Sequence, residues 1–126
     1  MPENRPFTFF EYAACSTCRK AKRWLDDHGV AYRAVPIVES PPAPDELSRL
    51  VDKSGLSIER WFNTSGQSYR ALMARMGKEK FSTLAPSEKL RLLAADGKMI
   101  KRPVLVAGGQ VIVGFDESRY ASLARA

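Results

Sequence analysis

The sequence is poor in residues that build metal centres. It contains two cysteines, Cys15 and Cys18, and a single histidine, His28. Structural zinc sites take four ligands, mostly of these two kinds. His28 also follows Cys18 by ten residues, which is about 15 Å along a helix. We therefore expect no metal site.

Long apolar segments are also lacking. No uninterrupted apolar run approaches the ~20 residues that cross a bilayer. Residues 1–5 carry no apolar stretch of the kind that marks a secretion signal. We expect a cytoplasmic protein that does not contact membranes. In that reducing compartment, a lone cysteine pair is more often catalytic or redox-sensing than structural.

Size and charge set broad limits. A chain of 126 residues is long enough for one domain, residues 1–126, with its own core, and we expect a monomer. The net charge of +6 favours anionic partners in general. The basic residues are spread along the chain, so direct nucleic-acid binding is not indicated. One local basic group follows the cysteines and consists of Arg19, Lys20, Lys22 and Arg23.

The motif Cys15-Ser16-Thr17-Cys18 joins an aromatic strand candidate, residues 7–12, to an amphipathic helix candidate, residues 19–28. A thiol at a helix start faces unpaired backbone N–H groups and the positive end of the dipole, and both favour the thiolate. This position predicts that Cys15 is the nucleophile and Cys18 the resolving thiol. The alternative is two buried cysteines that only fill space in the core.

The rest of the chain predicts an α/β domain. Ala21, Trp24, Leu25 and His28 form one apolar stripe on the first helix, and residues 30–38 predict a second, parallel strand. Short helical candidates fill residues 43–97. Gly108-Gly109 then separates two β-branched runs, 104–107 and 110–113, which is typical of a hairpin. Residues 116–124 predict a closing helix.

Two segments near the cysteines and the hairpin carry a family resemblance. They are Tyr12-Ala13-Ala14-Cys15-Ser16-Thr17-Cys18-Arg19-Lys20-Ala21 and Lys101-Arg102-Pro103-Val104. Together with Asn63-Thr64-Ser65-Gly66 and the element order, they resemble the arsenate reductase/Spx-like family of thioredoxin-fold proteins, and its uncharacterised reductase-like branch in particular. The resemblance spans nearly the whole chain.

The resemblance implies a thioredoxin-like fold. A four-stranded mixed sheet with flanking helices is expected from residues 6–38 and 99–125, with residues 43–97 as an inserted all-helical subdomain. In the family, the proline before the hairpin is cis and faces the reactive cysteine. This implies a cis Arg102-Pro103 bond beside Cys15.

The resemblance also implies an anion site. In glutaredoxin-dependent arsenate reductases, the first cysteine attacks the oxyanion, glutathione resolves the adduct and three arginines hold the anion. Arg102 matches one arginine, whereas the other two positions fall at Asn63 and Gly114. Arg60 or Arg70 are candidate replacements from the insert. We expect weak or absent arsenate reduction.

Four residues around the motif complete this site. Ser16 and Thr17 would offer backbone N–H groups to an anion at the helix start, and Arg19 and Arg102 would add charge. An exposed, uninvolved Arg19 is the alternative. The expected activity is thiol–disulfide exchange on a small oxyanion or thiol substrate. No bound cofactor is expected, and glutathione or glutaredoxin is the expected external reductant.

Two other functions stay open. Spx-type regulators use the two-cysteine motif as an oxidation switch and bind RNA polymerase. The Arg102-Pro103 pair occurs in both branches and does not discriminate between them. A redox-inert binding module is the third interpretation.

Overall fold

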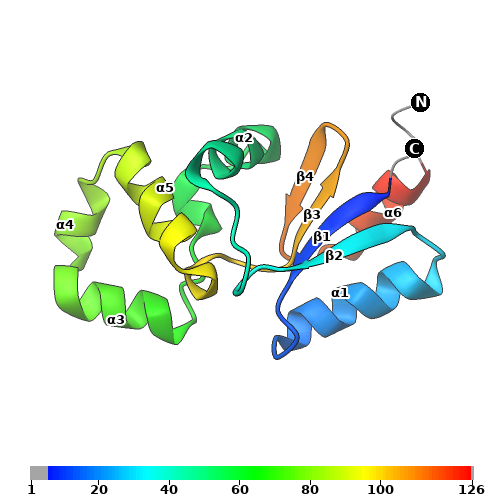
Figure 1. Ribbon diagram of the computed structural model, residues 1–126, viewed down its shortest axis with the longest axis horizontal. Helices are drawn as coiled ribbons and strands as arrows, with labels where there is room; N and C mark the ends of the chain where they lie inside the picture. The colour runs from blue at the N-terminus through cyan, green and yellow to red at the C-terminus, as the bar shows by residue number, and fades with distance from the viewer. Residues whose placement is uncertain (1–5, 126) are drawn as a thin grey trace.

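The computed structural model describes residues 6–125 and contains one four-stranded sheet of order β2-β1-β3-β4 (Figure 1). Strands β1 (Phe7–Glu11) and β2 (Tyr32–Pro36) are parallel. Strands β3 (Val104–Ala107) and β4 (Gln110–Val113) form an antiparallel hairpin, and β3 pairs antiparallel with β1. The mixed sheet with flanking helices confirms the predicted fold class.

The two faces of the sheet bury different side chains, because successive residues of a strand point to opposite sides. Phe9 and Leu105 pack with residues of α1 (Ser16–Asp27) and α6 (Glu117–Arg125). Phe10 and Val104 pack with the helical insert instead. The insert and the cysteine-bearing helix therefore share the sheet but lie on opposite faces of it.

The elements between β2 and β3 are all helical (Figure 1). In chain order they are α2 (Pro44–Ser54), η2 (Ile58–Trp61), α3 (Gln67–Met76), α4 (Lys78–Ser82), α5 (Pro86–Ala95) and η3 (Gly97–Met99). Their shared core includes Leu47, Trp61, Leu72 and Leu93, each at most 1% exposed. Within the described residues, no helix is long and apolar enough to cross a bilayer.

Three local predictions need correction. The first helix begins at Ser16 rather than residue 19, since Cys15 occupies the N-cap position. The second strand is shorter than residues 30–38. His28 was predicted on the buried stripe but is exposed; its ring stacks on Trp24 with centroids 3.8 Å apart, so it covers the core edge without entering it.

Residues 97–101 join the insert to the sheet. The Asn63 N–H donates to the Met99 carbonyl at 2.8 Å, and the Lys101 N–H donates to the Trp61 carbonyl at 2.8 Å. Gly97 packs directly on the chain after β2. A Cβ added to Gly97 would overlap the Ile37 carbonyl and lie 2.7 Å from the Val38 Cα. Only glycine permits this approach of two backbones.

We predict that Gly97→Ala lowers the free energy of unfolding by about 1–3 kcal/mol, the usual cost of overpacking. Gly109→Ala is the matched control, because a Cβ there would meet no atom within 4 Å and the residue does not have a positive φ. The control should change stability by less than ~0.5 kcal/mol. Urea denaturation followed by circular dichroism measures both. Equal losses of stability in the two variants would show that the close backbone contact at Gly97 does not require a glycine.

Candidate active site

Cys15 caps the start of α1. A backbone hydrogen bond from the Cys15 N–H to the Tyr12 carbonyl (2.9 Å) turns the chain after β1, and the Cys15 carbonyl accepts from the Arg19 N–H at 3.1 Å. The Cys15 backbone is extended, with φ −87° and ψ 121°, as usual for an N-cap. Its thiol is half-buried, whereas Cys18, one turn into the helix, is 0% exposed.

The surroundings of Cys15 favour the thiolate. Burial raises the pKa of the Cys15 thiol, but the Cys18 N–H and thiol, the Arg102 charge and the Thr17 N–H lower it, and the net direction is down. The N–H groups of the first turn of α1 thus act directly on the Cys15 sulfur. This is the environment of a reactive cysteine.

Cys18 has the opposite character. Burial raises the pKa of the Cys18 thiol well above its ordinary value, and the neighbouring Cys15 sulfur raises it further. An N–H···S contact from Tyr12 and the Arg102 charge oppose this only in part. Both cysteines are free thiols. The pair therefore combines a half-buried thiol of lowered pKa with a fully buried thiol of raised pKa.

Arg102 provides the positive charge closest in sequence to the cis proline. Its Nη1 donates to the carbonyls of Lys98 and Ile100, both at 3.2 Å, and its guanidinium carbon lies 4.9 Å from the centroid of the Tyr12 ring. Its Nε is buried without a hydrogen-bond partner among the described residues. The Arg102-Pro103 peptide bond is cis, as the resemblance implies. Arg102 is thus oriented by two backbone carbonyls through its Nη1.

The other predicted site residues differ in their exposure and in their hydrogen-bond partners. Ser16 and Thr17 are exposed in the first turn of α1. The Arg19 Nη1 donates to the Ala13 carbonyl at 2.9 Å, so this guanidinium braces the loop before Cys15. The Arg70 Nη2 is similarly engaged by the Ser65 carbonyl at 2.6 Å. Asn63 is held through its backbone N–H.

Sequence reasoning missed Tyr12 and Lys101. Tyr12 lies under the Arg102 guanidinium, and an aromatic residue just before the motif was a usable signal. Gly114 donates its N–H to the Pro103 carbonyl at 2.8 Å. The Lys101 Cε lies 3.8 Å from where a Cβ on Gly114 would be. A lysine side chain therefore lies beside Gly114.

Within the described residues, no group of three or more His, Cys, Asp or Glu side chains is arranged to hold a metal ion. The arrangement is one of thiols, helix N–H groups and one oriented guanidinium. Chemically, it can stabilise a thiolate and attract an anion to it.

The model of the ArsC family matches residues 10–123. The chain belongs to the ArsC family. It is 47% identical over 113 residues, 90% of this chain and 93% of the relative, to the uncharacterized protein YusI of Bacillus subtilis (strain 168). It superposes with TM-score 0.81 and 42% identity on a structure described as a possible arsenate reductase from Streptococcus mutans UA159, covering 94% and 99% of the two chains.

Regulators are also among the relatives. The global transcriptional regulator Spx of Streptococcus mutans (strain ATCC 700610 / UA159) is 26% identical over 110 residues, which cover 87% of this chain and 77% of the regulator. The relatives of this chain therefore include proteins named as a possible arsenate reductase and as a transcriptional regulator.

We predict that Arg102→Gln slows alkylation of Cys15 at neutral pH. The Arg102 charge lowers the pKa of Cys15, so its loss raises that pKa and decreases the thiolate fraction; each unit of pKa is about tenfold in rate while the thiolate is the minor form. The rate with iodoacetamide as a function of pH measures the shift. Arg23→Gln is the charge-matched control, because Arg23 is an exposed residue of α1, the helix that Cys15 caps. A pH profile that is identical in both variants would exclude an electrostatic role for Arg102.

Proposed function

We propose that this protein is a cytoplasmic, monomeric thiol–disulfide oxidoreductase in which Cys15 is the nucleophile and Cys18 the resolving thiol. The position of Cys15 at the N-cap of α1, one turn before the fully buried Cys18, carries the proposal, and the opposite pKa directions of the two thiols support it. A lowered pKa gives the attacking thiol a larger thiolate fraction near neutral pH, whereas a resolving thiol is needed only after the mixed disulfide has formed.

The reaction proceeds in two exchanges. The Cys15 thiolate attacks one sulfur of a substrate disulfide, a new S–S bond forms, and the other sulfur leaves as a thiolate that takes up a proton. The Cys18 thiol then gives its proton to the second leaving thiolate and attacks the Cys15 sulfur. The product is a Cys15–Cys18 disulfide and two substrate thiols. Two thiols of glutathione or glutaredoxin reduce this disulfide again.

Anionic groups of the substrate would bind beside Cys15. The first-turn N–H groups of α1, contributed by Ser16 and Thr17, are donors suited to a carboxylate, and the Arg102 charge beside Cys15 adds attraction for an anion. Pro103 lacks an N–H but keeps its carbonyl, which Gly114 already engages. Glutathione, a thiol with two carboxylates, matches this combination of a thiolate attack site and neighbouring anion donors.

Arsenate fits the donors less well. Two of the three arginine positions of arsenate reductases hold Asn63 and Gly114. Arg70 is engaged by a carbonyl, and Arg60 is exposed, with no side-chain hydrogen bond recorded among residues 6–125. Each charged hydrogen bond contributes about 1.5–3 kcal/mol, so Lys101 alone would not restore the anion affinity of three arginines.

We predict that Cys18→Ser traps a mixed disulfide between Cys15 and glutathione when the reduced variant is incubated with oxidised glutathione. Resolution needs the Cys18 thiol, so the adduct should persist and be visible by intact-protein mass spectrometry. The native chain should form the internal disulfide instead, and Cys15→Ser should form neither. An adduct on Cys18 in the Cys15→Ser variant would reverse the assigned roles.

We predict, second, that the native chain exchanges thiols with glutathione mixed disulfides, whereas its turnover of arsenate is weak or absent. Both are measured in one coupled assay, with NADPH, glutathione reductase, glutathione and glutaredoxin, run with and without arsenate. Lys101→Gln should lower whatever arsenate rate remains and leave thiol exchange unchanged. Arsenate turnover at a rate comparable to thiol exchange would show that arsenate is a substrate and contradict this prediction.

A redox-controlled regulator is the second candidate, favoured by the similarity to Spx and to the regulatory protein MgsR of Bacillus subtilis (strain 168), which is 25% identical over 118 residues. A pull-down with RNA polymerase distinguishes the two functions. Binding by the oxidised chain but not the reduced one, without turnover in the coupled assay, would support the regulator.

A further inference from the structure

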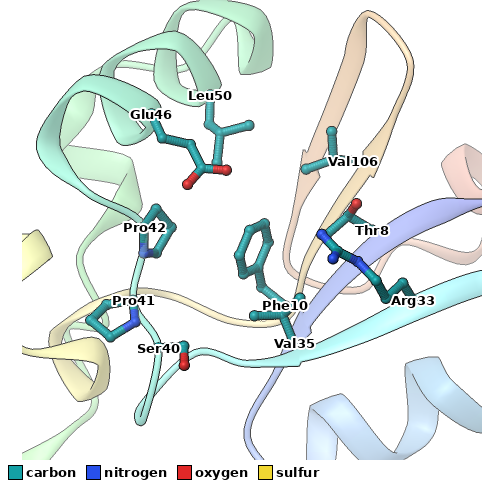
Figure 2. Close-up of a pocket in the computed structure, with 10 residues that line it drawn as sticks. All are labelled: Thr8, Phe10, Arg33, Val35, Ser40, Pro41, Pro42, Glu46, Leu50 and Val106. Atoms are coloured by element: carbon teal, nitrogen blue, oxygen red, sulfur yellow. The ribbon is translucent and has the colours of Figure 1, made fainter.

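A cavity of about 190 Å³ lies on the sheet face covered by the insert (Figure 2). Its apolar surface comes from Phe10 and Val35 on two neighbouring strands, Leu50 of α2 and Val106 of β3. Pro41 and Pro42, in the segment between β2 and α2, close one side of it. The cavity is thus bounded by the sheet, one helix and a stiff proline segment.

This cavity is separate from the cysteine site. None of Cys15, Cys18, Arg102 or Pro103 lines it. The separation follows from the sheet, because Phe10 points to the insert whereas Phe9, next in sequence, packs against α1. A ligand here would therefore not contact the thiols.

Two opposite charges face this cavity from opposite walls. Arg33 extends from β2, and Glu46 comes from the first turn of α2, with the Phe10 ring between them (Figure 2). The Thr8 and Ser40 side chains add two hydroxyls. Among residues 6–125, the structure records no side-chain hydrogen bond or ion pair for any of these four groups, and Arg33 does not pair with Glu46. Four polar groups around an apolar floor are therefore available to a ligand.

The volume of the cavity and its two charges limit which ligands fit. Sites for drug-sized ligands are typically about 300–1,000 Å³, so this cavity suits a molecule smaller than a drug. A ligand with a single charge would be attracted by one of Arg33 and Glu46 and repelled by the other. A small zwitterion with an apolar body satisfies both charges and the floor.

We propose that this cavity binds a free α-amino acid with an aliphatic side chain. The carboxylate accepts hydrogen bonds from the Arg33 guanidinium, a pair that is often bidentate. The ammonium group donates hydrogen bonds to the Glu46 carboxylate on the opposite wall. The aliphatic side chain packs on Val35, Leu50 and Val106.

L-Leucine, titrated into the full-length chain, tests the proposal through amide signals in proton–nitrogen correlation NMR spectra. We expect saturable shifts for residues of β1, β2 and the start of α2, and none for Cys15 or Cys18. Isocaproate lacks the ammonium group and isoamylamine lacks the carboxylate. Each should bind on the order of tenfold more weakly than L-leucine, because one charged hydrogen-bonding pair is lost.

Variants provide the second arm. Arg33→Gln and Glu46→Gln should each weaken L-leucine binding by about tenfold. Arg49→Gln and Asp45→Asn change the same charges on exposed residues of α2 outside the cavity and should leave the affinity unchanged. All four positions are exposed, and circular dichroism verifies folding.

The proposal is overturned if L-leucine causes no saturable shift at millimolar concentration. It is also overturned if isocaproate and isoamylamine bind as well as L-leucine, or if the control variants weaken binding as much as Arg33→Gln and Glu46→Gln. Binding in the Cys15→Ser variant equal to that of the native chain is expected, since the cavity and the thiols lie apart.

Discussion

The packed backbone of residues 97–103 is the constraint on which the rest of the structure depends. Gly97 lies against the chain that leaves β2, and the following residues pair with residues 61–63 of the insert. The same segment supplies both carbonyls that orient the Arg102 guanidinium. Its last residue, Pro103, accepts a hydrogen bond from Gly114 after β4. One short segment therefore holds the insert against the sheet and fixes the position of the Arg102 charge beside the cysteines.

The electrostatics of the cysteine pair follow from this arrangement. Desolvation acts on both thiols and raises both pKa values. At Cys15, helix N–H groups, the Cys18 thiol and Arg102 overcome it; at Cys18, deeper burial and the neighbouring sulfur prevail. The helix explains the difference in depth, because Cys15 is the N-cap of α1 and half-buried, whereas Cys18 lies one turn into α1 and is fully buried. Geometry, and not residue type, distinguishes the two thiols.

Local patterns predicted the elements better than the contacts between them. Gly108-Gly109 between β-branched runs predicted the hairpin, and its strands begin and end where expected, since turn chemistry is local. The thiol–helix junction was likewise predicted. Two arrangements of long side chains were not predicted. The Arg19 guanidinium donates to the Ala13 carbonyl, and Arg33 and Glu46 line one cavity from opposite walls. Both depend on where long side chains lie in space, which residue spacing does not encode.

The asymmetry of the two thiols is the central claim, and a pH titration of their Cβ carbon signals by NMR tests it most directly. Cys15 should titrate below the ordinary thiol value of 9.0, and Cys18 should remain protonated far above it. Titration of Cys18 before Cys15, or of both cysteines together near the ordinary value, would contradict the account.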